Sequence, residues 1–240
     1  MKLKLFNYKT FSWKKYIFET LSIFIAVVSA FALSNWSQNL RDDNAEIEIL
    51  KEVKNAIQND LYAIKFNKDN NTISKESCNY MRELINDKEV KNDSLVYFYI
   101  MTFRDYSFTG NTTGYKGLES KGLDILDDNL LRTRISYYYN YYFKILEKIE
   151  GESDQHLAFK NYFFKFNDKL FPFMVFDDNG QLVNFEQPIL LSESEKKELL
   201  SYLWMLENDR ADKIMLYEQL EDQLKIVEEQ VNEVLEEKLD

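Results

Sequence analysis

An apolar run near the N-terminus constrains the fold of this 240-residue chain more than any other feature. From Tyr16 to Trp36 the sequence reads YIFETLSIFIAVVSAFALSNW, and Glu19 is the only charged residue within it. A helix of about 20 residues spans the roughly 30 Å hydrocarbon core of a bilayer. Trp13 and Tyr16 stand at one end and Trp36 at the other, where aromatic rings favour the membrane interface. We therefore predict a transmembrane helix over 16–36.

The charges on the two sides of this run indicate its orientation. Five lysines precede it, namely Lys2, Lys4, Lys9, Lys14 and Lys15. With Glu19 they give residues 1–40 a charge of +4, so the total of −11 leaves −15 for residues 41–240. Because basic loops stay on the cytoplasmic side, we expect residues 1–15 in the cytoplasm and 37–240 outside. A domain with this much negative charge repels the phosphate backbone of nucleic acids, which argues against nucleic-acid binding.

Two features of the run allow more than one interpretation. Glu19 lies four residues after Lys15, so it is either a snorkelling carboxylate paired with that lysine or a contact with another subunit or polar channel. The sequence Ala30-Phe31-Ala32 also fits a signal-peptidase site. Against cleavage, Glu19 interrupts the apolar run early and the helical pattern continues past Trp36. We therefore favour a retained anchor.

Helices dominate the rest of the expected fold. No glycine or proline occurs between Tyr16 and Ile64, which predicts one helix continuous from the membrane into the outer domain and ending near 67–71. The hairpin signal at Asp177-Asp178-Asn179-Gly180 predicts two short strands over about 171–186. We expect further helices over about 72–87, 94–104, 113–121, 130–150, 152–169, 192–207 and 209–238. The apolar run 94–104 leaves strand and helix open, and we favour a helix because helices flank it. Gly151 should close the helix 130–150, and Ser192 or Ser194 with Glu195 should begin the helix 192–207 as a capping box. The predicted fold class is all-α with a small β-hairpin, in which the membrane helix joins a helical bundle.

Two aromatic or apolar groups in this bundle are candidate interaction surfaces. In the amphipathic C-terminal helix 209–238, a 4–3–4–3 stripe is formed by Leu220, Leu224, Val227, Val231 and Val234. That stripe either forms a coiled coil with a partner or packs back on the membrane-proximal helix. The helix over 130–150 carries a tyrosine cluster that includes Tyr137, Tyr138, Tyr141 and Tyr142. These rings lie in a core between helices, on a recognition surface or around a ligand cavity.

Residues that commonly carry catalysis are scarce. His156 is the one histidine, which excludes zinc sites built on several histidines, and no nucleophile elbow accompanies it. Cys78 is the one cysteine, so an intrachain disulfide is excluded, and a half-buried small residue on a helix is favoured over a reactive thiol. Asp177-Asp178-Asn179-Gly180 lacks the spacing of a calcium loop and is better explained as a turn. We expect no enzyme activity, no cofactor and no metal.

Two stretches resemble a known family. The run around the anchor places Glu19 near the start of the apolar segment, then Ala30 with Phe31, then Asn35-Trp36. In this it is similar to the opening of an uncharacterised single-span envelope protein family of Gram-negative bacteria. Residues 112–139, TTGYKGLESKGLDILDDNLLRTRISYYY, are similar to a second pattern of that family. The resemblance implies an inner-membrane protein with a periplasmic helical domain, and it implies no activity. Phe18 and Ala26 depart from it, because the family often has glycine there.

Three classes of function fit this sequence. The favoured one is a non-enzymatic scaffold or accessory subunit that assembles with itself or with other envelope proteins through protein–protein contacts. A ligand-sensing periplasmic module is the second, and it needs a membrane partner because only about 15 residues precede the span. An enzyme of unrecognised type is the third. A cavity between the helices 130–150 and 152–169 would favour the sensor.

Overall fold

The computed structural model describes residues 13–88, 90, 92–152 and 154–239, and their side chains except those of residues 15, 92, 93, 152 and 154–161. Most of the predicted cytoplasmic segment 1–15 therefore lies outside the described residues. The chain divides into two units, residues 1–48 and 49–240. Helix α1, Trp13–Ile85, supplies residues 13–48 of the first unit and 49–85 of the second.

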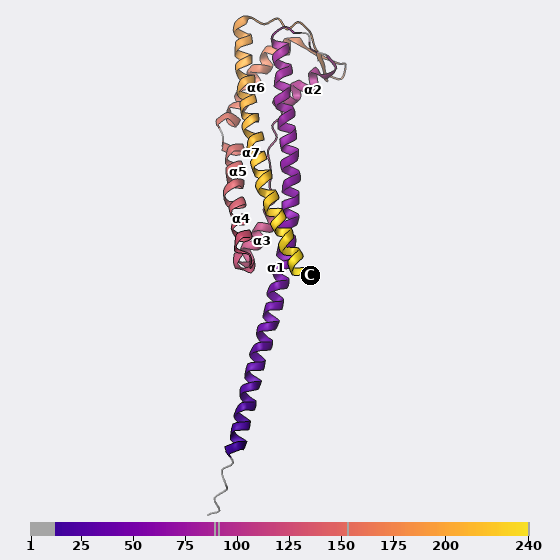
Figure 1. The fold of residues 1–240 in the computed structure, drawn as a ribbon. Helices are drawn as coiled ribbons and strands as arrows, with labels where there is room; N and C mark the ends of the chain where they lie inside the picture. Colours follow the sequence, from indigo (N-terminus) through magenta and orange to yellow (C-terminus); the bar gives the residue numbers. More distant parts are fainter. Residues whose placement is uncertain (1–12, 89, 91, 153, 240) are drawn as a thin grey trace, which may run out of the picture. The chain divides into compact units, whose positions relative to one another are not determined.

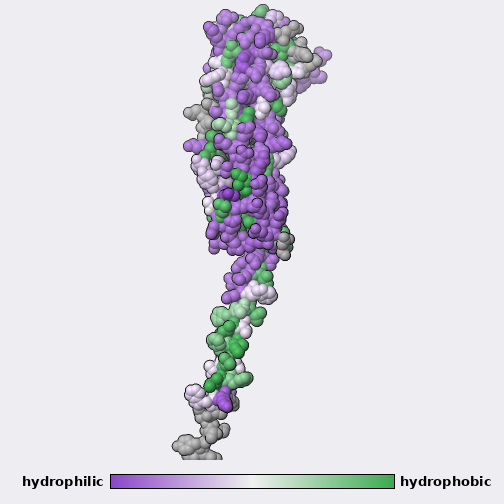
Figure 2. Space-filling view, in the orientation of Figure 1, coloured by the Kyte–Doolittle hydropathy of each residue, from purple (hydrophilic) through white to green (hydrophobic). Residues whose placement is uncertain are grey.

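In the first unit, α1 carries the apolar run predicted from the sequence. All side chains from Tyr16 to Trp36 are exposed, and Figure 2 shows the hydrophobic surface gathered over this segment. Among the described residues, α1 is the one helix that is long and apolar enough to cross a membrane. This segment is therefore a candidate membrane span by its length and composition.

In the second unit, α1 continues further than the sequence predicts. The prediction of a helix end near 67–71 and a new helix over 72–87 is wrong, because α1 runs unbroken to Ile85. Asn67 and Asn71 do not stop the helix. Each side-chain amide donates to the backbone carbonyl four residues earlier, Ala63 or Asn67, at 2.8 Å. Both asparagines therefore fit within the continuous helix.

The next elements follow the predicted order. They are α2 (Asn92–Phe103), α3 (Thr113–Lys121), η1 (Leu123–Ile125), α4 (Asn129–Tyr137), η2 (Tyr138–Tyr142) and α5 (Phe143–Glu152). Asp128 caps α4, since its Oδ1 accepts the amides of Leu130 and Leu131 at 2.7 and 3.1 Å. The single helix predicted over 130–150 is interrupted by η2, which is a π-helical turn. Gly151 lies inside α5 and does not close the helix.

The predicted β-hairpin is confirmed. After α6 (Asp154–Leu170) and η3 (Phe171–Phe173), β1 (Met174–Phe176) pairs antiparallel with β2 (Leu182–Phe185). The carboxylate of Asp177 accepts the amides of Asn179 and Gln181 at 2.9 and 2.8 Å, and Gly180 adopts a φ of 75°. Turn chemistry thus accounts for the Asp-Asp-Asn-Gly sequence.

The C-terminal part is one helix, α7 (Glu193–Leu239), where the sequence predicts two. Its start is the predicted capping box, in which the Ser192 amide donates to Glu195 Oε2 at 3.0 Å and the Glu195 amide donates to Ser192 Oγ at 3.3 Å. The break predicted between 207 and 209 is absent. The predicted helix 209–238 is therefore the second part of α7.

Within the second unit, α7 lies alongside α1, and α4 and α5 follow α7 (Figure 1). Lys68 pairs with Glu221 at 2.5 Å, and Arg82 pairs with Glu207, so α1 and α7 are antiparallel neighbours. Towards the hairpin, a core forms around Phe103, Phe166 and Phe185. A helical fold with a small hairpin, as predicted, is what the structure shows.

Candidate functional site

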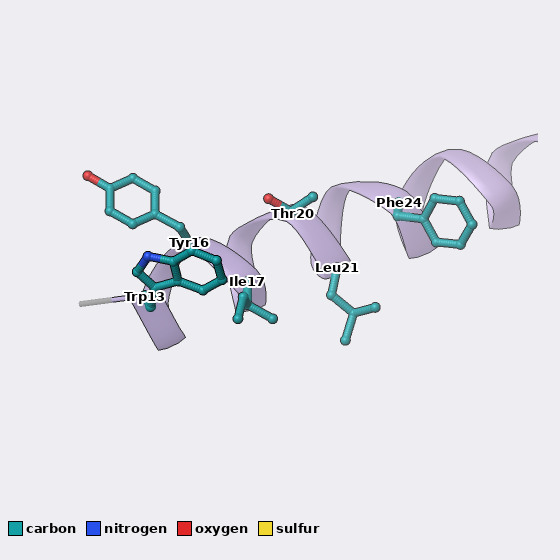
Figure 3. Close-up of a pocket in the computed structure, with 6 residues that line it drawn as sticks. All are labelled: Trp13, Tyr16, Ile17, Thr20, Leu21 and Phe24. Atoms are coloured by element: carbon teal, nitrogen blue, oxygen red, sulfur yellow. The ribbon is translucent and has the colours of Figure 1, made fainter. Parts of the chain in front are cut away.

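The ends of the apolar segment in the first unit carry exposed aromatic rings. Trp13 is 70% exposed, Tyr16 53% and Trp36 62%. Figure 3 shows the rings of Trp13 and Tyr16 next to one another at the start of α1, with Ile17, Leu21 and Phe24 following along it. Rings so placed have the chemistry of membrane-interface anchors, with an apolar body and a polar tip.

Glu19 is exposed on α1, one turn into the apolar segment. The predicted pair with Lys15 cannot be described, since the side chain of Lys15 lies outside the described residues. The small side chains of Ser22, Ala26 and Ala30 lie on the same helical face as Glu19, because residues three and four apart are neighbours on a helix. Glu19 thus shares its face with three small side chains and with Ile23.

The predicted tyrosine cluster is split between core and surface. Tyr138 is buried, whereas Tyr137 and Tyr141 are 49% and 47% exposed. The exposed pair stacks at a centroid distance of 4.8 Å, and the half-buried ring of Tyr142 meets both edge-on. The core interpretation therefore describes Tyr138, whereas Tyr137 and Tyr141 are exposed, as a recognition surface requires.

The hollow beside the tyrosines lies between α4, η2 and α7, and it measures about 30 Å³, which is far less than a ligand pocket. The cavity expected for a ligand sensor lies elsewhere, between the helices 130–150 and 152–169, and stays a prediction. The side chains of 154–161, with that of His156, lie outside the described residues.

The stripe predicted as a coiled-coil surface lies inside the second unit. Leu220, Leu224, Val227 and Val231 are 0–3% exposed, and Val234 is half-buried. Of the two interpretations, internal packing is the one observed. The stripe is therefore not a free surface for a partner.

The same stripe reveals charged residues that the sequence analysis missed. Buried positions of α7 follow alternating steps of four and three residues through Leu199, Leu203, Leu206, Arg210, Lys213, Tyr217, Leu220, Leu224, Val227 and Val231. Arg210 and Lys213 thus occupy core positions of a heptad pattern and are 1% and 0% exposed. The continuation of the spacing through two cations is the signal that identifies them.

Arg210 is held by partners from three parts of the chain. Its Nε donates to Ser74 Oγ of α1 at 3.2 Å, and its Nη1 donates to Asp105 and Asp209 at 3.0 and 2.9 Å. Lys213 Nζ donates to the same oxygen of Asp105 at 2.9 Å. Two buried cations therefore neutralise buried Asp209 and half-buried Asp105, as buried charges must be neutralised.

These buried charges fasten the irregular segment 104–112, which connects α2 with α3. Arg210 Nη2 donates to the carbonyl of Arg104 at 3.3 Å, and the amide of Phe108 donates to Glu150 Oε2 at 2.9 Å. Tyr217 donates its hydroxyl to the other oxygen of Glu150. Burial raises the pKa of Glu150, although hydrogen bonds from Tyr217 and Phe108 oppose this. The carboxylate supplies a partner that a buried, non-helical amide needs.

Asp60 of α1 fastens the end of the same segment. Its Oδ1 accepts the amide of Asn111 at 2.5 Å, and its Oδ2 accepts the hydroxyl of Tyr139 at 3.3 Å. Burial raises the pKa of Asp60 to about 6, although these two hydrogen bonds oppose the shift. We name Arg210, Lys213, Asp105, Asp209, Glu150 and Asp60 the buried charge layer. Its side chains hold the backbone of segment 104–112 in place through hydrogen bonds.

Cys78 is buried in the core of the second unit. Burial, with a smaller contribution from Glu207, raises the pKa of its thiol to about 12, so the sulfur is protonated at neutral pH. This is the environment of a structural thiol.

Comparisons of the chain with protein-family models, curated proteins and solved structures gave no match.

Proposed function

We propose that this protein is a membrane-anchored, non-enzymatic helical protein that acts as an assembly or accessory subunit through protein–protein contacts. The observation that carries the proposal is the apolar segment of α1, where no side chain from Tyr16 to Trp36 is buried. Exposing such a segment to water is costly at about 25 cal/mol per Å² of apolar surface. A bilayer removes that cost.

We further propose that the N-terminus is cytoplasmic and that the second unit lies in the periplasm. The lysines that precede the span and the acidic residues that follow it support this orientation. The resemblance to an envelope family, carried by Glu19 and Asn35-Trp36, supports the compartment.

A role in assembly is supported by two features of the described residues of the second unit. Its buried charge layer is saturated by contacts to the chain's own backbone and side chains, and its tyrosine hollow is too small for a ligand. Glu19 offers a contact within the membrane, because a carboxylate there favours a polar partner on a neighbouring helix. That partner is a second copy or another envelope protein.

Membrane extraction and protease accessibility test the anchor and its orientation. In a Gram-negative host, we expect the full chain to stay in the membrane pellet after alkaline carbonate washing. Protease added to spheroplasts should degrade the second unit while intact cells protect it. Release into the soluble fraction, with a mature N-terminus at Leu33, would show a cleaved signal peptide and overturn the proposal.

The native mass of the detergent-solubilised protein tests assembly. We expect a species heavier than the monomer or a co-purifying membrane protein, and Glu19→Gln should weaken that association. Asp42→Asn, which removes an exposed carboxylate just beyond the span, is the matched control and should change nothing. A strict monomer with no partner would remove the support for assembly.

A further inference from the structure

We propose that an exposed aromatic patch on the second unit docks a lysine- or arginine-bearing segment of another protein. The patch consists of Tyr137, Tyr141, Tyr142 and Ile226. This inference rests on the proposed function, since it names the chemistry of the partner that an assembly subunit would bind.

The patch is exposed and already ordered. Tyr137, Tyr141 and Ile226 are 49%, 47% and 40% exposed. The rings of Tyr137 and Tyr141 stack with an interplanar angle of 11°, and Tyr142 lies edge-on to them at 5.2 and 5.4 Å. Rings that hold one another in place lose little conformational freedom on binding, which is why tyrosines are common in recognition surfaces.

The π-helical turn η2 is an independent observation at the same place. It packs the adjacent Tyr138 and Tyr139 into the core while Tyr137 and Tyr141 face outwards. This arrangement leaves the buried hydroxyl of Tyr138 without a hydrogen-bond partner among the described residues, which a core side chain usually avoids. π-helical turns are rare and frequently mark functional sites.

The charges around the patch favour a cationic partner. Exposed residues Asp222, Ile226, Glu229 and Glu233 follow steps of four, three and four along α7, so they share one face. On the tyrosine side, Arg134 donates to Gln230 Oε1 at 2.7 Å and Lys144 pairs with Glu147 at 3.5 Å. The patch thus offers aromatic faces beside the carboxylates of α7, a setting that suits ammonium and guanidinium groups.

A second copy of the chain is a poor occupant of this patch. Residues 41–240 carry a charge of −15, because residues 1–40 contribute +4 to the total of −11. A two-fold symmetric dimer through the patch would bring two acidic faces of α7 together. Like charges opposite one another suppress such pairing, whereas a basic segment complements the surface.

Peptide binding to the detergent-solubilised full chain tests the inference. The probe is a short synthetic peptide of alternating lysine and leucine, and a glutamate–leucine peptide is its charge control. We expect the lysine peptide alone to bind, and Tyr141→Ala to weaken its binding about tenfold or more. Tyr62→Ala, which removes a 75% exposed tyrosine from α1, is the matched control and should leave binding unchanged.

Charge reversal sharpens the test. Asp222→Lys combined with Glu229→Lys should weaken binding of the lysine peptide to a similar extent, while circular dichroism shows an unchanged fold. Equal binding of both peptides, or equal binding to wild type and Tyr141→Ala, would overturn the inference. So would a homodimer that Tyr141→Ala dissociates in light scattering. Because each variant is also washed with carbonate, failure of the patch is distinguishable from failure of the anchor.

Discussion

The two stretches of α1, residues 16–36 and 49–85, share one helical backbone and differ in the surroundings of their side chains. In the first, apolar side chains are exposed, and Glu19 is exposed with them. In the second, apolar side chains are buried, and the polar groups buried with them, such as Asp60 and Ser74, have hydrogen-bond partners. The helix satisfies its own backbone in both stretches. The second stretch is therefore packed in protein, and the exposed apolar surface of the first agrees with the membrane span that we propose.

Arg210→Ala should cause the largest loss of stability, and that loss should be confined to the second unit. It leaves Asp105 and Asp209 with Lys213 as the remaining cation of the layer, so we expect a loss of about 3–5 kcal/mol in unfolding free energy. Chemical denaturation of the solubilised chain measures this. Lys225→Ala breaks an exposed pair with Glu221 and should cost under about 1 kcal/mol. Equal losses in both variants would show that burial does not distinguish these pairs.

Val27→Arg tests the exposed apolar stretch of α1, residues 16–36. An arginine at mid-span costs about 3 kcal/mol of insertion free energy, so carbonate washing should release a substantial fraction of the variant. The denaturation midpoint of the second unit should stay unchanged. Val27→Leu keeps the segment apolar and serves as the control. If Val27→Arg stayed fully in the pellet, the apolar run would not be what holds the protein to the membrane.

Asp60 makes the second unit sensitive to pH. Its pKa is raised from 3.8 to about 6, so the folded state binds the proton more tightly than the unfolded state. Its contribution to stability is therefore present below pH 4 and is lost as pH rises through about 6. Two pKa units correspond to roughly 3 kcal/mol, an upper figure for this group.

Denaturation of wild type and Asp60→Asn between pH 4 and 7 checks this. The asparagine keeps an acceptor for the Asn111 amide and carries no charge, so we expect a flatter profile and a gain in stability at pH 7. Identical slopes in the two proteins would show that Asp60 does not titrate in this range.

Sequence reasoning located both long helices and divided each of them where polar residues occupy core positions. Apolar spacing fades in α1 at Asn67 and Asn71, and in α7 around Arg210, so periodicity of apolar residues predicts ends there. The heptad steps in fact continue through these polar residues. Ser74, the next core position of α1 after Asn71, accepts a hydrogen bond from Arg210 of α7. Had the heptad pattern been allowed to include polar residues at core positions, it would have predicted α1 and α7 each as one continuous helix.

The hydrogen bonds that hold segment 104–112 could not be predicted from the sequence, for a different reason. Its amides at Phe108 and Asn111 find carboxylates at Glu150 and Asp60, which are distant in the chain. No local spacing relates such partners. Strong local signals fared better, since the Asp177–Gly180 turn and the Ser192 capping box both form as predicted.

A pair of tyrosine-to-phenylalanine variants gives the smallest effects and the finest comparison within the second unit. Tyr217→Phe removes the hydroxyl that donates to buried Glu150, so the carboxylate loses a partner and we expect a cost of about 1–3 kcal/mol. Tyr138→Phe removes a buried hydroxyl that contacts no hydrogen-bond partner among the described residues, so its effect should fall within about 0.5 kcal/mol or be stabilising. Denaturation midpoints of the two variants measure the difference. A loss of more than 1 kcal/mol for Tyr138→Phe would mean that an ordered water or a bound group satisfies that hydroxyl, and the π-helical turn would then be a polar site in its own right.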